Sequence, residues 1–142
     1  MMKKNYSRYS YRRRNVTKLP VYKKALYIFK LSRQVVEYIR GDKSILELHS
    51  SKIIADQFSD KLVMASLGLA PKIAMAEASA DPSIKLESVS SLEKTTVALL
   101  HYCEKLELSH GQGKEFLSLL RKEVKKFGHL QNKWAVGICN KN

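Results

Sequence analysis

The sequence has few of the residues that stabilise small secreted proteins or bind structural metals. Its 142 residues include only two cysteines, Cys103 and Cys139, which are far apart in the chain. Two thiols exclude a disulfide-dense scaffold and are fewer than the three or four ligands that a structural zinc site needs. We therefore expect reduced cysteines, no metal, no cofactor and a cytoplasmic location.

Long hydrophobic runs are also lacking. The most apolar stretch, residues 62–80, is interrupted by glycine, proline, lysine and glutamate, so we expect no membrane span. The first residues are basic and tyrosine-rich, unlike the apolar segment of a secretory signal. With 44% hydrophobic and 27% charged residues, the chain has the composition of a globular protein, and its length fits one domain.

Acidic residues are scarce. The chain has 13 Asp and Glu against 26 Lys and Arg, a formal net charge of +13. Residues 1–24 hold nine Lys and Arg and no acidic residue, so the excess is concentrated there. A surface of this charge attracts polyanions, which makes nucleic acid the expected partner. Acidic lipid is a weaker alternative, because no amphipathic helix accompanies the basic segment.

Apolar residues recur at three- and four-residue spacing, which is typical of helices, and no segment has the alternation of a strand. Gly41 is a plausible helix stop, and Asp81 followed by Pro82 is a helix start. A polar connection at residues 42–51 contains a short apolar group that could cover one end of a bundle. The expected helices span about residues 21–41, 52–79, 82–108 and 114–134.

Four amphipathic helices with mostly short connections predict an all-α fold. We expect an antiparallel up-down-up-down four-helix bundle over residues 20–134. A flexible basic arm at residues 1–19 precedes it, and a short tail at 135–142 follows.

The arm interleaves cations with tyrosines. This mixture suits a single nucleic-acid strand, with cations on the phosphates and aromatic rings against the bases. The alternative is a tail that only solubilises the protein. The candidate nucleic-acid-binding residues of the arm are Lys3, Lys4, Tyr6, Arg8, Tyr9, Tyr11, Arg12, Arg13, Arg14 and Lys18.

The last expected helix carries a second basic surface that could lie along a nucleic-acid backbone. An ordinary solvated helix face, with cations favoured near the helix C-terminus, is the alternative. The candidate residues are Arg121, Lys122, Lys125, Lys126 and Lys133.

The expected helix over residues 52–79 is apolar around most of its circumference in its second half. A helix that is apolar on all sides must be buried on all sides, which is difficult in a monomer of four helices. We expect a subunit interface formed by Val63, Met64, Leu67, Ala70 and Met75. The alternative is that this helix is simply the most central one.

Catalytic patterns are weak, and we expect a protein that is not an enzyme, with no catalytic residues. The four histidines fall in different segments, without the spacing to Cys, Asp or Glu that a metal site requires. Small helical ribonucleases of the HEPN type place an arginine a few residues before a histidine. Arg121 and His129 come nearest to this pattern and are too widely spaced, so a ribonuclease is a low-weight alternative.

Three stretches of the chain match motifs of a known family. Residues 19–25 (LPVYKKA) are similar to an opening L-x-V-[WY]-x-K-A. Residues 65–71 (ASLGLAP) with 75–78 (MAEA) are similar to A-x-S-I-P-x-N-I-A-E-G. Residues 90–93 (SSLE) are similar to G-S-L-x-E. The chain thus resembles the four-helix bundle family of 23S ribosomal RNA intervening-sequence proteins and the accessory variability determinants of diversity-generating retroelements.

The resemblance implies a homopentamer with a basic surface. For the retroelement branch it further implies binding to a reverse transcriptase and its template RNA during mutagenic cDNA synthesis. DNA is an alternative nucleic-acid ligand. The basicity and the arm favour this branch. The alternative is a ribosome-associated or structural bundle protein of the intervening-sequence type.

Overall fold

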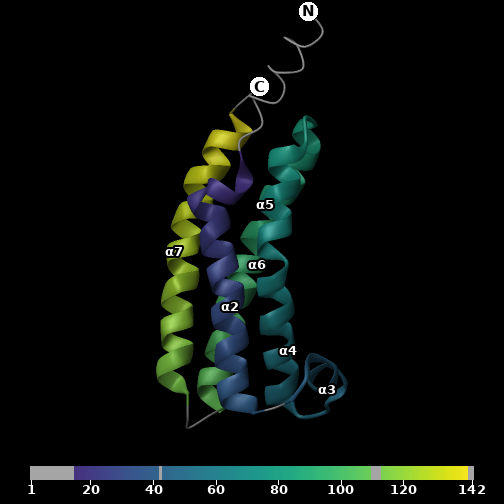
Figure 1. The fold of residues 1–142 in the computed structure, drawn as a ribbon, viewed down its shortest axis with the longest axis vertical. Coiled ribbons are helices and arrows are strands. Elements are labelled where there is room, and N and C mark those ends of the chain that lie inside the picture. The colour runs from purple at the N-terminus through teal and green to yellow at the C-terminus, as the bar shows by residue number, and fades with distance from the viewer. Residues whose placement is uncertain (1–14, 42, 110–112, 141–142) are drawn as a thin grey trace, which may run out of the picture.

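The computed structural model describes residues 15–41, 43–109 and 113–140, and every regular element in these ranges is helical. The prediction of an all-α protein is therefore confirmed for this part of the chain. In Figure 1, α2 and α6 run towards the end at which α3 lies, and α4, α5 and α7 run back. The elements are η1 (Val16–Lys18), α2 (Pro20–Arg40), α3 (Ile45–Ser50), α4 (Ile54–Leu67), α5 (Leu69–Ala78), α6 (Pro82–Ser109) and α7 (Lys114–Cys139).

The helix contacts place the first and last long helices side by side. Helix α2 packs against α4, α5 and α7, and α6 packs against the same three helices. Going around the molecule, the order is therefore α2, α4 with α5, α6 and α7, as Figure 1 also shows. Neighbouring long helices run in opposite directions, which is the arrangement that short connections favour.

The core consists of apolar residues at helical spacing on the facing sides of these helices. Burying one large aliphatic or aromatic side chain contributes roughly 1.5–3 kcal/mol, so this set supplies most of the driving force for folding. The largest fully buried apolar side chains are Ile28, Leu48, Leu62, Leu69, Ile73, Leu92, Leu99, Leu106, Leu117, Leu120 and Phe127.

The helix predicted over residues 52–79 is instead two helices, α4 and α5, which meet at Gly68. Pro71 lacks a backbone N–H, and its ring would collide with the carbonyl of Leu67 in a continuous helix. The amide of Gly68 still donates to the carbonyls of Met64 and Ala65, so the interruption is short.

The predicted ends of the bundle were both wrong. The tail was expected to begin at residue 135, but α7 continues to Cys139 because Trp134 and the buried Ile138 extend its apolar stripe. The arm was expected to reach residue 19, but residues 16–18 form η1, and Val16 and Leu19 pack against the core. Residues 1–14 of the arm lie outside the described residues.

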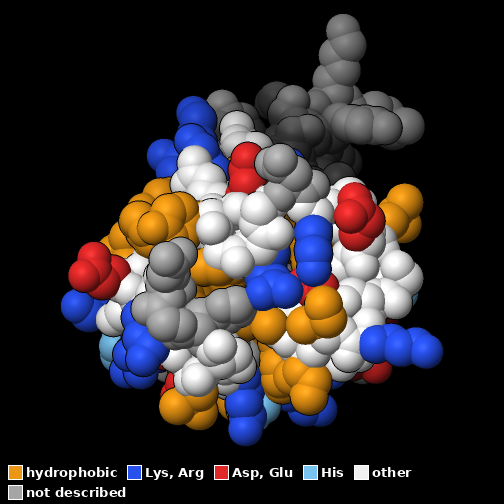
Figure 2. Space-filling model, turned by 90° about the horizontal axis from the view of Figure 1, so that it is seen from below, with side chains coloured by type: hydrophobic (Ala, Val, Ile, Leu, Met, Phe, Trp, Pro, Cys, Tyr) orange, Lys and Arg blue, Asp and Glu red, His pale blue; other side chains and the backbone are white. Residues whose placement is uncertain are grey.

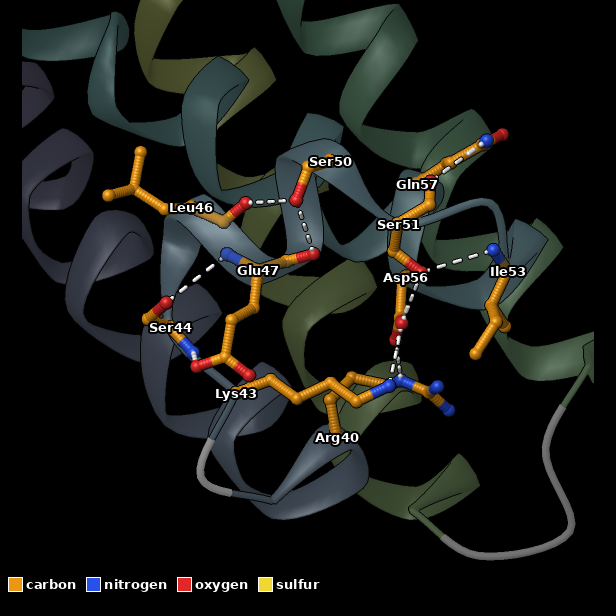
Figure 3. Close-up of polar contacts among 10 residues, drawn as sticks. All are labelled: Arg40, Lys43, Ser44, Leu46, Glu47, Ser50, Ser51, Ile53, Asp56 and Gln57. Carbon is orange, nitrogen blue, oxygen red and sulfur yellow. Dashed lines mark hydrogen bonds and ion pairs between the residues drawn. The ribbon is translucent and has the colours of Figure 1, made fainter.

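A polar junction holds α3 between α2 and α4 (Figure 3). Ser44 and Glu47 form a reciprocal capping box that starts α3, and Leu48 anchors it in the core. The apolar group expected to cover the end of the bundle does so through Leu48 only, because Ile45 and Leu46 are exposed. Seen from this end, hydrophobic side chains lie open between Lys and Arg side chains (Figure 2).

Candidate nucleic-acid interface

Helix α7 presents its predicted cations to solvent. Lys122, Lys125, Lys126 and Lys133 are exposed, whereas Arg121 is only partly exposed. The helical repeat explains this segregation, because the buried residues occupy the opposite side of α7. The structure therefore brings four of the five predicted residues of this helix to its outer face.

Two of the five cations are paired with carboxylates. Arg121 Nη2 lies 3.2 Å from Glu107 Oε1 of α6, and Lys126 Nζ lies 3.0 Å from Glu123 Oε2. Lys122, Lys125 and Lys133 have no ion pair within the described part of the chain. These three lysines are the best placed of the predicted α7 residues to bind phosphates.

Helix α2 adds cations that the sequence analysis did not assign to the site. Lys23 and Lys30 are exposed and seven residues apart, which puts them on one face of the helix. Their spacing was visible in the sequence, but their position beside α7 was not. We define the basic face as six exposed lysines of the two helices: Lys23, Lys30, Lys122, Lys125, Lys126 and Lys133.

Glu123 joins α2 to α7 beneath the basic face. Its Oε1 accepts a hydrogen bond from Lys24 Nζ at 2.9 Å, and its side chain is nearly buried. The hydrogen bonds from Lys24 and Lys126 lower the pKa of Glu123, although burial opposes them. The carboxylate therefore stays ionised at neutral pH and offsets part of the repulsion between the two basic helices.

The remaining long helices are close to neutral. Helix α2 has five Lys and Arg against one Glu, and α7 has six against two. By contrast, α6 has three Lys against four Glu, α5 has one Lys and one Glu, and α4 has one Lys and two Asp. Because α2 and α7 are neighbours, the positive charge of the described helices is gathered on one side of the molecule.

The edge of α7 next to α6 is balanced in charge. A surface hollow of about 410 Å³ lies along this edge. Its lining includes Glu107 and Glu115 as well as Lys114 and Lys122. Carboxylates on this side disfavour phosphates, so the positive potential is directed towards α2.

Most of the predicted arm residues cannot be placed. Lys18 is exposed in η1, immediately before α2. The other candidates lie outside the described residues: Lys3, Lys4, Tyr6, Arg8, Tyr9, Tyr11, Arg12, Arg13 and Arg14.

The predicted subunit interface is only partly available. Val63 and Ala70 are buried in the core, because they point to the inner side of α4 and α5, so their assignment to an interface was wrong. Met64, Leu67 and Met75 are exposed, and their spacing places them along one outer stripe.

Groups that could carry catalysis are dispersed. The described residues contain no cluster of three or more His, Cys, Asp and Glu side chains suited to a metal ion. His49 Nδ1 lies 3.0 Å from Asp60 Oδ2, a pair that the sequence did not reveal. Arg121 is paired with Glu107, and His129 is exposed on the same helix.

None of the described helices combines the length and the hydrophobicity needed to cross a membrane. No protein-family model matches the chain, and no match was found among curated proteins or solved structures.

Proposed function

We propose that this protein is a non-enzymatic accessory protein that binds RNA through its basic face and its N-terminal residues. The observation that carries the proposal is the concentration of cations on two neighbouring helices, while the other long helices are near neutral. A stripe of unpaired lysines attracts a phosphate backbone, because each contact releases a counterion into solution. Residues 1–24 hold nine Lys and Arg, of which Lys18 lies in η1 and Lys23 and Lys24 lie in the first turns of α2.

The test is RNA binding as a function of salt. Each lost phosphate contact lowers the log–log salt slope by about 0.7 for a single strand. The triple variant Lys122→Gln, Lys125→Gln and Lys133→Gln should therefore lower the slope by about 2 and weaken binding most at low salt.

A matched control removes the same charge from elsewhere. Helix α6 offers Lys85, Lys94 and Lys105, and their triple Gln variant has the same net charge as the α7 variant. If the α6 variant lost as much affinity as the α7 variant, binding would depend on net charge alone. Failure of the natural sequence to bind RNA in dilute buffer would end the proposal.

We further propose, following the family resemblance, that the bundle docks on a polymerase such as a reverse transcriptase and holds its template RNA. The basic face supports this proposal, because RNA phosphates held there would bring the template, and with it the polymerase, to the bundle. Co-purification of a polymerase with the chain should be lost when Lys122, Lys125 and Lys133 of α7 are altered.

The exposed stripe of Met64, Leu67 and Met75 is our proposed contact between copies of the chain, because exposed apolar stripes favour protein interfaces. The resemblance suggests a pentamer. We also propose that the helices form an up-down-up-down four-helix bundle in which α4 and α5 act as one helix. In this arrangement the stripe lies on the side away from α7. Light scattering should give a mass several times 16.2 kDa. Met64→Glu should reduce it, whereas Leu86→Glu on the exposed side of α6 should not.

A further inference from the structure

Within the described part of the chain, the exposed aromatic side chains are confined to the two most basic helices. Among the described Tyr, Phe and Trp residues, those with large exposure are Tyr27 at 44%, Tyr38 at 59% and Phe116 at 43%. Tyr27 and Tyr38 belong to α2 and Phe116 belongs to α7. The other aromatic side chains are partly or fully buried: Tyr22, Phe29, Phe58, Tyr102, Phe127 and Trp134.

Contacts place these rings at the seam between α2 and α7. The Tyr27 ring lies under Lys24 Nζ, 5.4 Å from the ring centroid, and the same ammonium reaches Glu123 of α7. The Tyr38 ring packs edge-on against Phe116, with centroids 4.7 Å apart and planes at 65°. Both tyrosines are therefore on the side of α2 that faces α7.

Cations are interleaved with the rings along this seam. Eleven residues, or three turns, separate the tyrosines, which corresponds to about 16 Å along the axis of α2. Lys30 is exposed between them on α2. Lys126 is exposed on α7 and pairs with Glu123, which also accepts a hydrogen bond from Lys24 of α2. The alternation of ring and cation is that of a surface that binds stacked bases and phosphates together.

We propose that the seam between α2 and α7 binds single-stranded RNA in preference to duplex RNA, with bases stacking on Tyr27 and Tyr38. This inference rests on the proposed RNA binding and specifies its substrate class. A duplex presents phosphates but keeps its bases stacked on one another, so it uses the lysines and not the rings. An unpaired strand uses both, and every base offers a face to an aromatic ring.

The two contributions differ in their salt dependence. Phosphate contacts weaken steeply as salt rises, whereas stacking is little affected. The preference for a single strand should therefore widen as the salt concentration increases.

The experiment compares a labelled, unstructured RNA of about 20 nucleotides with the same strand annealed to its complement, using fluorescence anisotropy and the full chain. The double variant Tyr27→Leu and Tyr38→Leu keeps apolar side chains but removes the rings. It should bind the single strand at least about tenfold more weakly and the duplex within about twofold of the natural sequence.

The variant Tyr27→Phe and Tyr38→Phe is the matched control. It keeps both rings and removes only the hydroxyls, so it should retain single-strand affinity. If the double Leu variant unfolds, the single Tyr27→Leu variant serves, because Tyr38 and its contact with Phe116 are then untouched.

The outcomes separate this inference from the proposed function. If the natural sequence binds neither RNA in dilute buffer, the proposed function fails. If it binds both equally, or if the Leu variant loses the same affinity for both, RNA binding stands and the stacking role of the tyrosines is wrong.

Discussion

Replacing Asp56 with asparagine would remove one charge from the junction of α2, α3 and α4 while keeping the size of the side chain. The Asp56 carboxylate is fully buried. It accepts hydrogen bonds from Arg40 Nε at 2.5 Å, from Lys43 Nζ at 2.7 Å and from Ser51 Oγ at 2.7 Å (Figure 3). The variant therefore tests how much an ionised carboxylate contributes to holding three elements together.

The magnitude follows from the pKa of Asp56. Burial raises it, but the hydrogen bonds from Lys43, Ser51 and Arg40 outweigh burial and lower the pKa from 3.8 to about 2. Since one pKa unit corresponds to about 1.4 kcal/mol, the ionised carboxylate stabilises the fold by about 2 kcal/mol. The pKa is lower in the folded state, so this stability is complete above about pH 4 and is lost as the pH falls through about 2.

Urea unfolding followed by far-UV circular dichroism measures the effect. At pH 7, Asp56→Asn should lower the free energy of unfolding by about 2 kcal/mol and the melting temperature by roughly 7 °C. The difference from the natural sequence should shrink as the pH approaches 2. The control is Glu93→Gln, which removes an exposed carboxylate of α6 that has no ion pair among the described residues. An Asp56→Asn protein as stable as this control at pH 7 would refute the reasoning.

Three further predictions concern single side chains. Burial raises the pKa of Cys103 to about 12, so its thiol stays protonated at pH 8. Iodoacetamide at pH 8 should therefore modify only Cys139 in the folded protein. Equal labelling of the two cysteines in mass spectrometry would contradict this. Gly113→Ala should lower stability by about 2 kcal/mol, because Gly113 has φ +84° and a Cβ there would collide with Ile39; an unchanged melting curve would be the contrary result. Glu123→Gln should cost about 1 kcal/mol in urea unfolding, and an unchanged midpoint would show that its lysine contacts contribute little.

Local signals in the sequence predicted two of the helix boundaries correctly. Gly41 was predicted as a helix stop and adopts φ +68°, a conformation that favours glycine. Pro82 begins α6, as predicted, and the amide of Ser83 donates to the side chain of Asp81. The break at Gly68 was not predicted, because the apolar pattern continues across it, although Pro71 disfavours a continuous helix there.

Properties that depend on which helices are neighbours were not predictable from local pattern. Val63 and Ala70 look like interface residues when a helix is considered alone, yet other helices of the chain cover them. Tyr27 and Tyr38 look like ordinary members of an amphipathic helix. Their place beside the cations of α7 depends on contacts between residues that are about 80–100 positions apart, which no local spacing encodes.

The position of Glu123 shows why stability and RNA binding should respond oppositely to one substitution. Two helices of like charge repel each other, and Glu123 reduces that repulsion by pairing with Lys24 and Lys126. Its replacement by glutamine loosens the contact between α2 and α7, and at the same time it leaves two more lysines available to phosphates. If the basic residues only keep the protein soluble, the Glu123→Gln variant should lose stability without gaining affinity for RNA. A face that binds RNA would lose stability and gain affinity, with a steeper dependence on salt.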